Sequence, residues 1–242
     1  MANLLIEIGN TALKAAWAEG TTLGKTFRYQ GEKVMEFILS VVEKEKADVM
    51  AVSSFNPLST EEEEMLRAFC RHLMVFDKNH TETLLEAGFP EYLSYDRAAS
   101  LMAVRFLFAG KPCTVFDFGT TLTVDFIDED GRYGGGNVSP GCRTRFKALN
   151  RYSKSLPLVD TPEGEVGIGK TETGSIESGV ISGIIFEIKG YMALHPQNVV
   201  IFTGGDAEYF AARMKSPVFT IGNLMLMGFA LVTDDYVKKN FS

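Results

Sequence analysis

The sequence predicts a mixed α/β fold built as two similar halves with a cleft between them. Two observations support this prediction. A pattern of apolar strand, carboxylate, glycine turn and second strand occurs twice, about half a chain apart. In each half, strand-like segments precede helix-like segments, an order typical of domains whose helices pack on a sheet.

Apolar periodicity places the individual elements. The expected strands cover residues 3–8, 13–18, 48–53, 74–76, 114–118, 122–128 and 199–203. The expected helices cover residues 31–46, 60–73, 96–109, 142–150, 173–194 and 222–239. Thr60 and Glu63 predict a capping box, so the acidic run after Thr60 is interpreted as a helix start. The first domain is expected at 1–113 and the second at 114–242.

Composition excludes several classes of function. A length of 242 residues with 45% hydrophobic residues is sufficient for a packed core. The net charge of −7 provides no basic surface for a nucleic acid. The three cysteines and three histidines show no zinc-ligand spacing. Neither a signal peptide nor a membrane span is evident, so a soluble cytoplasmic protein with no nucleic-acid or membrane partner is expected.

The repeated pattern is visible in LLIEIGNTALKAAWAEG and TVFDFGTTLTVDFIDEDG. The aligned pairs are Glu7 with Asp117, Gly9 with Gly119, Asn10 with Thr120, and Thr11 with Thr121. Each copy predicts a β-hairpin whose glycine lets backbone N–H groups approach a ligand. Each acid could hold a cation. Two such turns facing each other would bind a polyphosphate from both sides, and the alternative is two ordinary hairpins.

A third glycine turn lies late in the chain. The strand ending at Thr203 is followed by Gly204 and Gly205, then by a helix-like run. A Gly-Gly step at the end of a strand lets an adenine or ribose lie against the backbone. The alternative is an ordinary turn.

The stretch GEVGIGKT, residues 164–171, matches a Walker A loop. A Walker loop must follow a buried strand, but Pro157 and Pro162 precede this stretch, and proline cannot donate to a sheet. A glycine-rich loop that leads into a helix is the favoured interpretation, and phosphate binding is the alternative.

Taken together, the motifs resemble the type III pantothenate kinases of the actin/Hsp70/sugar-kinase superfamily. The resemblance rests on E-I-G-N-T-x-x-K (Glu7 to Lys14), Y-D-R (Tyr95 to Arg97), D-F-G-T-T-x-T-x-D (Asp117 to Asp125), G-G-N-V-S-P-G (Gly135 to Gly141) and S-L-P (Ser155 to Pro157). It implies two RNase H-like domains, as in actin-like ATPases, and a homodimer.

The resemblance also implies an activity. Enzymes of this family use ATP to phosphorylate pantothenate to 4′-phosphopantothenate, the first step of coenzyme A biosynthesis. They require a divalent cation such as Mg²⁺ and a monovalent cation, K⁺ or NH₄⁺. The alternatives are a catalytically weak binding or regulatory protein of the accessory transcription factor type, and another small-molecule kinase of the superfamily.

The resemblance assigns roles residue by residue. Asp96 would be the catalytic base and Asp117 the monovalent-cation ligand. ATP contacts are expected at Glu7, Ile8, Gly9, Asn10, Thr11, Ala12, Leu13, Lys14, Gly119, Thr120 and Thr121. The strand pattern adds Gly204 and Gly205 of the third turn to these contacts. Pantothenate contacts are expected at Tyr92, Ser94, Tyr95, Asp96, Arg97 and Glu172.

Arg97 would face the substrate carboxylate, because an arginine fork suits that group. Without the resemblance, Asp96 and Arg97 would be interpreted as the start of a helix. At Glu7, Ser94 and Glu172 the family has aspartate, glycine and threonine, and near Glu172 either Thr171 or Thr173 could substitute. If this alignment holds, residues 164–171 line the acceptor pocket or the dimer interface.

Overall fold

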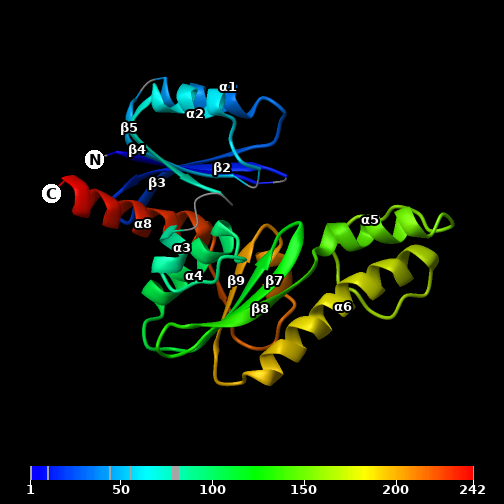
Figure 1. The fold of residues 1–242 in the computed structure, drawn as a ribbon. Coiled ribbons are helices and arrows are strands. Elements are labelled where there is room, and N and C mark those ends of the chain that lie inside the picture. Colours follow the sequence, from blue (N-terminus) through cyan, green and yellow to red (C-terminus); the bar gives the residue numbers. More distant parts are fainter. Residues whose placement is uncertain (1, 10, 44, 55, 78–81, 242) are drawn as a thin grey trace. The chain divides into compact units, whose positions relative to one another are not determined.

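The protein consists of two packing units, each built on its own five-stranded sheet (Figure 1). The computed structural model describes residues 2–9, 11–43, 45–54, 56–77 and 82–241. Unit 1 comprises Met1–Leu107 and Asn223–Ser242, and unit 2 comprises Phe108–Gly222. The predicted α/β class is therefore confirmed.

The sheet of unit 1 has the strand order β3-β2-β1-β4-β5. Its strands are β1 (Asn3–Ile8), β2 (Leu13–Glu19), β3 (Thr22–Tyr29), β4 (Ala47–Ser54) and β5 (Cys70–Phe76). The first three strands form an antiparallel meander, while β4 pairs parallel to β1 and β5 pairs parallel to β4. The carboxyl ends of β1 and β4 therefore lie side by side.

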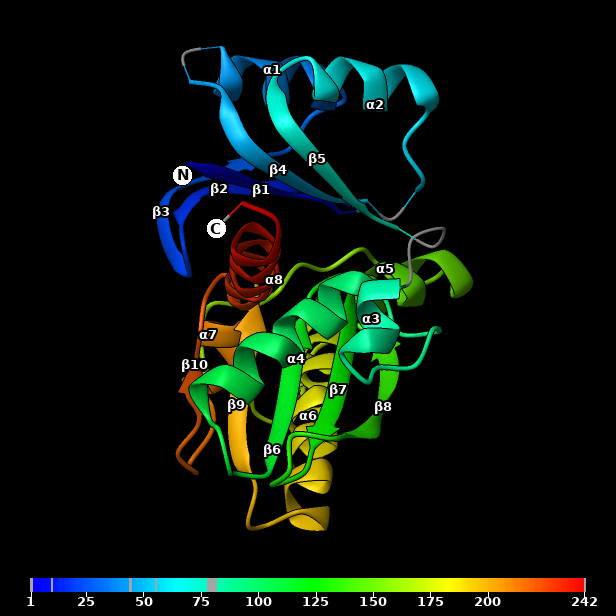
Figure 2. The same ribbon diagram turned by 60° about the vertical axis from the view of Figure 1, so that its left-hand side comes forward.

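Helices cover both faces of this sheet (Figure 2). On one face, α1 (Val34–Val42) and α2 (Thr60–Arg67) pack on a core of alternate strand residues, including Leu4 and Ile6. On the other face, α8 (Leu224–Phe241) contacts strands β1 to β4. The helix α4 (Tyr95–Leu107) packs along α8, and the short helix α3 (Glu82–Glu86) precedes it.

The sheet of unit 2 repeats this topology with the order β8-β7-β6-β9-β10. Its strands are β6 (Cys113–Phe118), β7 (Thr121–Ile127), β8 (Tyr133–Pro140), β9 (Val199–Gly204) and β10 (Phe219–Thr220). Again the first three strands form an antiparallel meander, and the last two are parallel. Thus β6 corresponds to β1, β7 to β2 and β9 to β4, which confirms the predicted duplication.

One face of the second sheet forms a large aromatic and aliphatic core. Its strand residues include Phe116, Phe118 and Phe202, which pack with Ile181 and Ile184 of α6. The helices of unit 2 are α5 (Cys142–Tyr152), α6 (Glu172–Leu194) and α7 (Ala207–Ala211). Because strand side chains alternate between faces, Asp117 and its neighbours on β7 and β9 point away from this core.

Several elements differ from the sequence prediction. The strands β3 and β8 were not predicted, because one is largely polar and exposed and the other is glycine-rich. The helix expected at 60–73 ends at Arg67, since Cys70–Phe76 pairs with β4 as a strand. The predicted capping box was also one residue late: the Ser59 hydroxyl accepts from the Glu62 N–H, and the Glu62 carboxylate accepts from the Ser59 N–H.

The sequence predicts a domain boundary between residues 113 and 114. The two packing units do not coincide with these domains, chiefly because the C-terminal helix α8 packs with unit 1. That division concerns two homologous RNase H-like domains and stays a prediction. Within the described residues, none of the helices combines the length and the apolar character that crossing a bilayer requires.

Candidate functional site

The first glycine turn joins β1 to β2 in unit 1. The backbone N–H of Gly9 donates to the carbonyl of Ala12 at 3.2 Å. A Cβ on Gly9 would lie only 3.1 Å from that carbonyl oxygen, so the turn has little room for a side chain. The predicted hairpin is therefore confirmed, while the predicted ATP contact Asn10 lies outside the described residues.

Glu7 is the acid of this first turn, and it faces Lys14 across the hairpin. The Lys14 ammonium nitrogen lies 3.1 Å from Glu7 Oε2, and the Glu7 side chain is only 15% exposed. Burial raises the pKa of Glu7, Lys14 opposes that rise, and the carboxylate of Asp96 adds to it. The predicted base is therefore an electrostatic neighbour of the first turn, within a single unit.

Asp96 lies in the first turn of α4, where it is half-buried. The carbonyl of Ser94 accepts the first helical hydrogen bond from Ala98 at 3.0 Å, so Ser94 stands at the helix entrance. Asp96 is therefore part of a helix start, as expected without the resemblance, and it also lies near Glu7.

The other predicted substrate contacts around α4 differ in exposure. Tyr92 is 75% exposed and Tyr95 is 8% exposed. The Tyr95 ring packs on Phe76 with 5.0 Å between centroids. Burial, with the nearby carboxylate of Glu82, raises the pKa of Tyr95 to about 12. Tyr95 therefore supports the helix entrance from the core side, while Tyr92 is open to solvent.

The second glycine turn joins β6 to β7 in unit 2 and is braced by the start of α5. Gly119 N–H donates to Thr121 O at 3.0 Å, and Gly141 N–H donates to Thr120 O at 3.0 Å. The Thr144 hydroxyl also donates to Thr120 O, at 2.7 Å. A Cβ on Gly141 would lie 2.1 Å from Gly119 O, so only glycine allows this approach.

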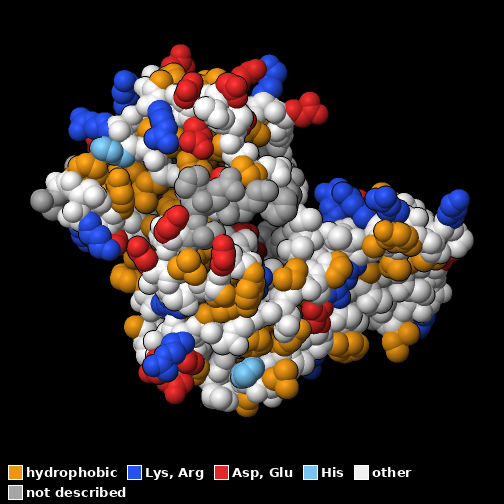
Figure 3. Space-filling view, viewed as in Figure 1, with side chains coloured by type: hydrophobic (Ala, Val, Ile, Leu, Met, Phe, Trp, Pro, Cys, Tyr) orange, Lys and Arg blue, Asp and Glu red, His pale blue; other side chains and the backbone are white. Residues whose placement is uncertain are grey.

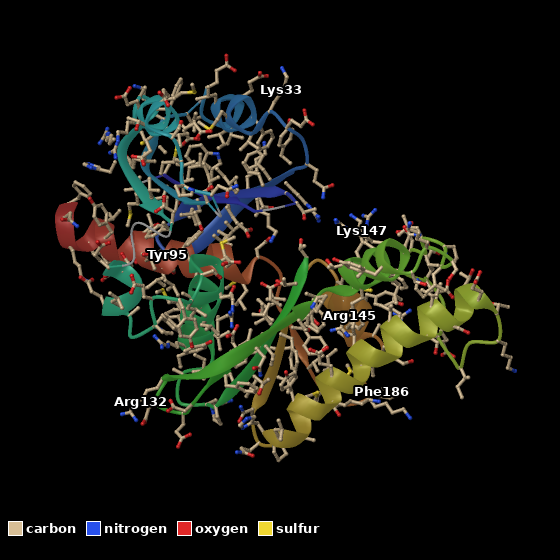
Figure 4. All side chains as sticks on the ribbon, turned by 45° about the vertical axis from the view of Figure 1, so that its right-hand side comes forward. Lys33, Tyr95, Arg132, Arg145, Lys147 and Phe186 are labelled. Carbon is tan, nitrogen blue, oxygen red and sulfur yellow. The ribbon has the colours of Figure 1, made fainter. Side chains whose placement is uncertain are left out.

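Helix α5 is basic, which distinguishes it in an acidic chain. Lys and Arg side chains gather over α5 in Figure 3. The basic residues of this helix are Arg143, Arg145, Lys147 and Arg151. Arg145 donates to Ser139 on β8 and pairs with Glu187 on α6, which fixes α5 against the sheet (Figure 4). The N-cap Gly141 has no capping side chain, so the partly positive helix N-terminus lies directly at the second turn.

The third glycine turn contacts the acid of the second one. Gly204 has a φ of +92°, and a Cβ there would lie 2.4 Å from Asp117 Oδ1. Asp206 N–H donates to Phe118 O at 3.3 Å, which ties the Gly-Gly step to the end of β6. Burial raises the pKa of Asp206, and Arg143 opposes that rise. The ends of β6 and β9 thus form one compact site.

The two hairpins are similar but not identical. In the first, Ile8 pairs with Leu13, which leaves residues 9–12 in the loop. In the second, Phe118 pairs with Leu122, which leaves residues 119–121. The first loop is therefore one residue longer, and a residue-by-residue alignment fails beyond the turn.

The Walker-like stretch lies in the loop between α5 and α6. No strand occurs in the fully described segment 153–171, so the strand that a Walker loop requires is missing. Thr171 caps α6 by accepting from Gly174 N–H at 3.0 Å, and Glu172 is exposed in the first helical turn. The favoured interpretation, a glycine-rich loop leading into a helix, is confirmed.

The structure thus gathers most of the predicted residues into two groups, and Glu172, exposed in the first turn of α6, belongs to neither. One group surrounds the β1–β2 turn and the start of α4 in unit 1, and the other surrounds the ends of β6 and β9 in unit 2. Sequence reasoning assigned no role to Arg143 or Asp206, and it used Thr123 and Gly141 only as parts of motifs. Among the described residues, no group of three or more His, Cys, Asp or Glu side chains is arranged to hold a metal ion.

Comparison with known proteins gives one consistent result. The family described as "Type III pantothenate kinase" matches residues 3–194. The type III pantothenate kinase of Bacteroides fragilis is 35% identical over 240 residues, covering 93% of this chain and 95% of that protein. The enzyme of the same name from Flavobacterium johnsoniae is 31% identical over 231 residues, covering 92% and 93%.

Among solved structures, the activator of the 2-hydroxyisocaproyl-CoA dehydratase from Clostridium difficile, with bound ADPNP, has a similar fold. The TM-score is 0.58 at 12% identity, with 100% of this chain and 98% of that chain covered. This likeness concerns the fold alone, and it agrees with the actin-like ATPase architecture of the two sheets.

Proposed function

This chain belongs to the type III pantothenate kinase family, and we propose how its two glycine-turn sites serve the reaction of that family. The enzyme phosphorylates pantothenate to 4′-phosphopantothenate at the expense of ATP, the first step of coenzyme A biosynthesis. The alternatives, a binding or regulatory protein and a kinase for another small molecule, are not favoured, because the curated relatives that cover most of the chain at 31–35% identity bear this one name.

One observation supports the proposed ATP site above the others. The acid and glycine turn occurs at the equivalent strand ends of two sheets with the same topology. At Gly9, Gly141 and Gly204 an added Cβ would crowd or strike the backbone or the acid, so the close packing of these turns requires glycine. Phosphoryl transfer depends mainly on positioning and on neutralising charge, and backbone N–H groups do both. The proposed contacts are Glu7 to Lys14, Gly119 to Thr121, Gly204 and Gly205.

Asp96 is proposed as the base that accepts the proton of the pantothenate hydroxyl. A carboxylate in reach of that hydroxyl removes its proton as the new P–O bond forms. Arg97 follows Asp96 on α4 and is proposed to bind the carboxylate of pantothenate. Tyr92, Ser94, Tyr95 and Glu172 complete the proposed acceptor contacts.

Two kinds of cation are proposed. A divalent cation such as Mg²⁺ would neutralise phosphate charge, and ATP supplies most of its ligands. Asp117 is proposed to bind K⁺ or NH₄⁺. The residues fit such an ion: the Asp117 carboxylate lies against Gly204, and its neighbours across both strand pairs are the threonines 123 and 203. Carboxylate and hydroxyl oxygens are suitable ligands for a hard cation.

A homodimer in the cytoplasm is also proposed. Unit 2 exposes several large apolar side chains, and groups of such side chains mark interaction surfaces. They include Phe186 and Leu194 on α6, each 69% exposed, and Val138 on β8, 58% exposed. All three cysteines are free thiols, which suits a reducing compartment.

The test is an ADP-release assay with ATP, Mg²⁺, K⁺ and a panel of acceptors. Release that depends on pantothenate supports the proposal. ATP binding without turnover would support the regulatory alternative, and release only with another acceptor would support a different kinase. A Lys170→Ala variant should retain its ATP affinity. Loss of that affinity would indicate that the Walker-like loop binds the phosphates.

A further inference from the structure

Thr123 on β7 has a buried hydroxyl that the described part of the chain leaves without a hydrogen-bond partner. The residue is only 6% exposed. Thr123 is the direct cross-strand partner of Asp117, so the two side chains lie next to each other on one face of the sheet. A buried hydroxyl without a partner is uncommon and calls for an explanation.

The duplicated hairpin of unit 1 supplies one. There, the cross-strand partner of the acid Glu7 is Lys14, whose ammonium lies 3.1 Å from the carboxylate. Counting residues from the acids would align Lys14 with Val124, but the shorter second loop places Thr123 at the equivalent position. The first hairpin therefore has a monovalent cation beside its acid, the ammonium group of Lys14. The second hairpin has the neutral hydroxyl of Thr123 at the equivalent position.

The surroundings of Asp117 favour a bound ion over another protein contact for this hydroxyl. Thr203, which is 4% exposed, flanks Asp117 on β9. Gly204 lies directly against Asp117 Oδ1 and has no side chain to block the approach. A hydroxyl oxygen has lone pairs available to a cation.

We propose that the Thr123 hydroxyl is a ligand of the monovalent cation at Asp117, and that this cation takes the place the Lys14 ammonium has beside Glu7. The inference rests on the proposed function, since it takes Asp117 as the cation site. It accords with the proposed use of either K⁺ or NH₄⁺, because the duplicated site of unit 1 contains an alkylammonium group.

Two variants of the full-length chain test the inference. Thr123→Val keeps the shape of the side chain and removes its oxygen. Thr123→Lys introduces an ammonium at the position equivalent to Lys14. The matched control is Thr233→Val on α8, because Thr233 is buried as well and its hydroxyl also has no partner among the described residues.

Two quantities are measured as functions of the KCl concentration, and choline chloride keeps the ionic strength constant. The first is the thermal midpoint with Mg²⁺ and a non-hydrolysable ATP analogue, and the second is pantothenate-dependent ADP release. For Thr123→Val we expect the half-saturating K⁺ concentration to rise by roughly two- to tenfold in both, the effect of one neutral polar contact. For Thr233→Val it should not change. A folded Thr123→Lys protein should turn over without added K⁺.

The inference is overturned if Thr123→Val responds to K⁺ as the wild type does, or if a folded Thr123→Lys variant still requires K⁺. If Thr123→Lys does not fold, the Thr123→Val titration decides alone. A wild-type protein that phosphorylates pantothenate without any response to K⁺ also overturns the inference but leaves the kinase reaction intact. A wild-type protein stabilised by K⁺ that does not phosphorylate pantothenate contradicts the proposed function instead.

Discussion

At the scale of single residues, Asp96 and Glu7 place two carboxylates near each other beside the first turn. Lys14 offsets part of this negative charge. The two acids have different environments, because Glu7 is held in an ion pair on a strand and Asp96 stands at a helix start. This difference agrees with the proposed roles, in which Glu7 belongs to the ATP-binding turn and Asp96 accepts a proton.

Replacing Asp96 by asparagine tests the proposed base. The amide keeps the size of the side chain but cannot accept the hydroxyl proton, so turnover should fall by roughly 10²- to 10⁴-fold. ATP affinity, measured by calorimetry, should stay within about twofold, because the amide leaves the turn intact. Asp235→Asn, at an exposed carboxylate paired with Lys239, is the control. Full activity in Asp96→Asn would remove this residue from its proposed role.

Glu7 predicts a dependence of stability on pH. Because burial raises its pKa, the folded chain binds this proton more tightly than the unfolded chain. The contribution of Glu7 to stability therefore falls as pH rises from the unfolded value of about 4.5 through the higher folded pKa. Glu7→Gln should melt at a higher temperature than the wild type at pH 7, and the gain should shrink toward pH 4.

Thermal unfolding at several pH values measures this effect. The control is Glu36→Gln, at an exposed carboxylate 2.9 Å from the Lys33 ammonium. A Glu7→Gln gain that is the same at every pH, or a loss at pH 7, would contradict the assignment of burial as the main cause.

At the scale of elements, the turn at the end of β9 contains two glycines, Gly204 and Gly205, and its conformation depends on the first of them. Gly204→Ala forces a Cβ to within 2.4 Å of Asp117 Oδ1 at a positive φ. The free energy of unfolding should fall by more than about 2 kcal/mol, and ATP affinity should fall with it. In Gly205→Ala the nearest atom is Phe118 O at 3.9 Å, so stability should hardly change. Equal melting temperatures for the two variants would refute this view of the turn.

The contact between α4 and α8 depends on another glycine. A Cβ on Gly228 would lie 1.8 Å from the carbonyl oxygen of Ala99, so Gly228→Ala must push the two helices apart. We expect a loss of about 1–3 kcal/mol in denaturant unfolding, together with lower turnover, because α4 bears Asp96. Gly190→Ala on α6 meets nothing within 4 Å and should instead stabilise the protein by about 0.5–1 kcal/mol. A Gly228→Ala protein as stable as the wild type would contradict this.

At the scale of the whole molecule, the proposed homodimer predicts a sedimenting mass of twice the 26.7 kDa chain. Phe186→Asp puts a charge on an exposed apolar side chain of α6 and should shift the protein toward monomer. Leu85→Asp, at a side chain 54% exposed on α3, is the control. Analytical ultracentrifugation measures the mass of the wild type and of both variants. A monomeric wild type would contradict the proposed dimer, and a Phe186→Asp protein that stays dimeric would show that α6 is not in the interface.

The local sequence was sufficient to predict the two hairpins, the duplication and the loop before α6. Apolar runs ending in an acid and a glycine identified both hairpins, because a tight turn restricts the residue at its corner. The duplication followed from those runs. The family and the candidate residues followed from a resemblance that also needed the motifs at residues 95–97, 135–141 and 155–157. The glycine-rich loop before α6 was also predicted correctly, because two prolines excluded a strand before it.

Only the tertiary structure decided where polar or glycine-rich segments become strands and which residues face one another. The strands β3 and β8 form because they pair with β2 and β7, and residues 70–73 leave the expected helix because β4 offers them a partner. The match of Lys14 with Thr123 is invisible to an alignment, since a one-residue difference in loop length shifts the register. Sheet pairing is made between segments distant in the chain, so no local pattern contains it.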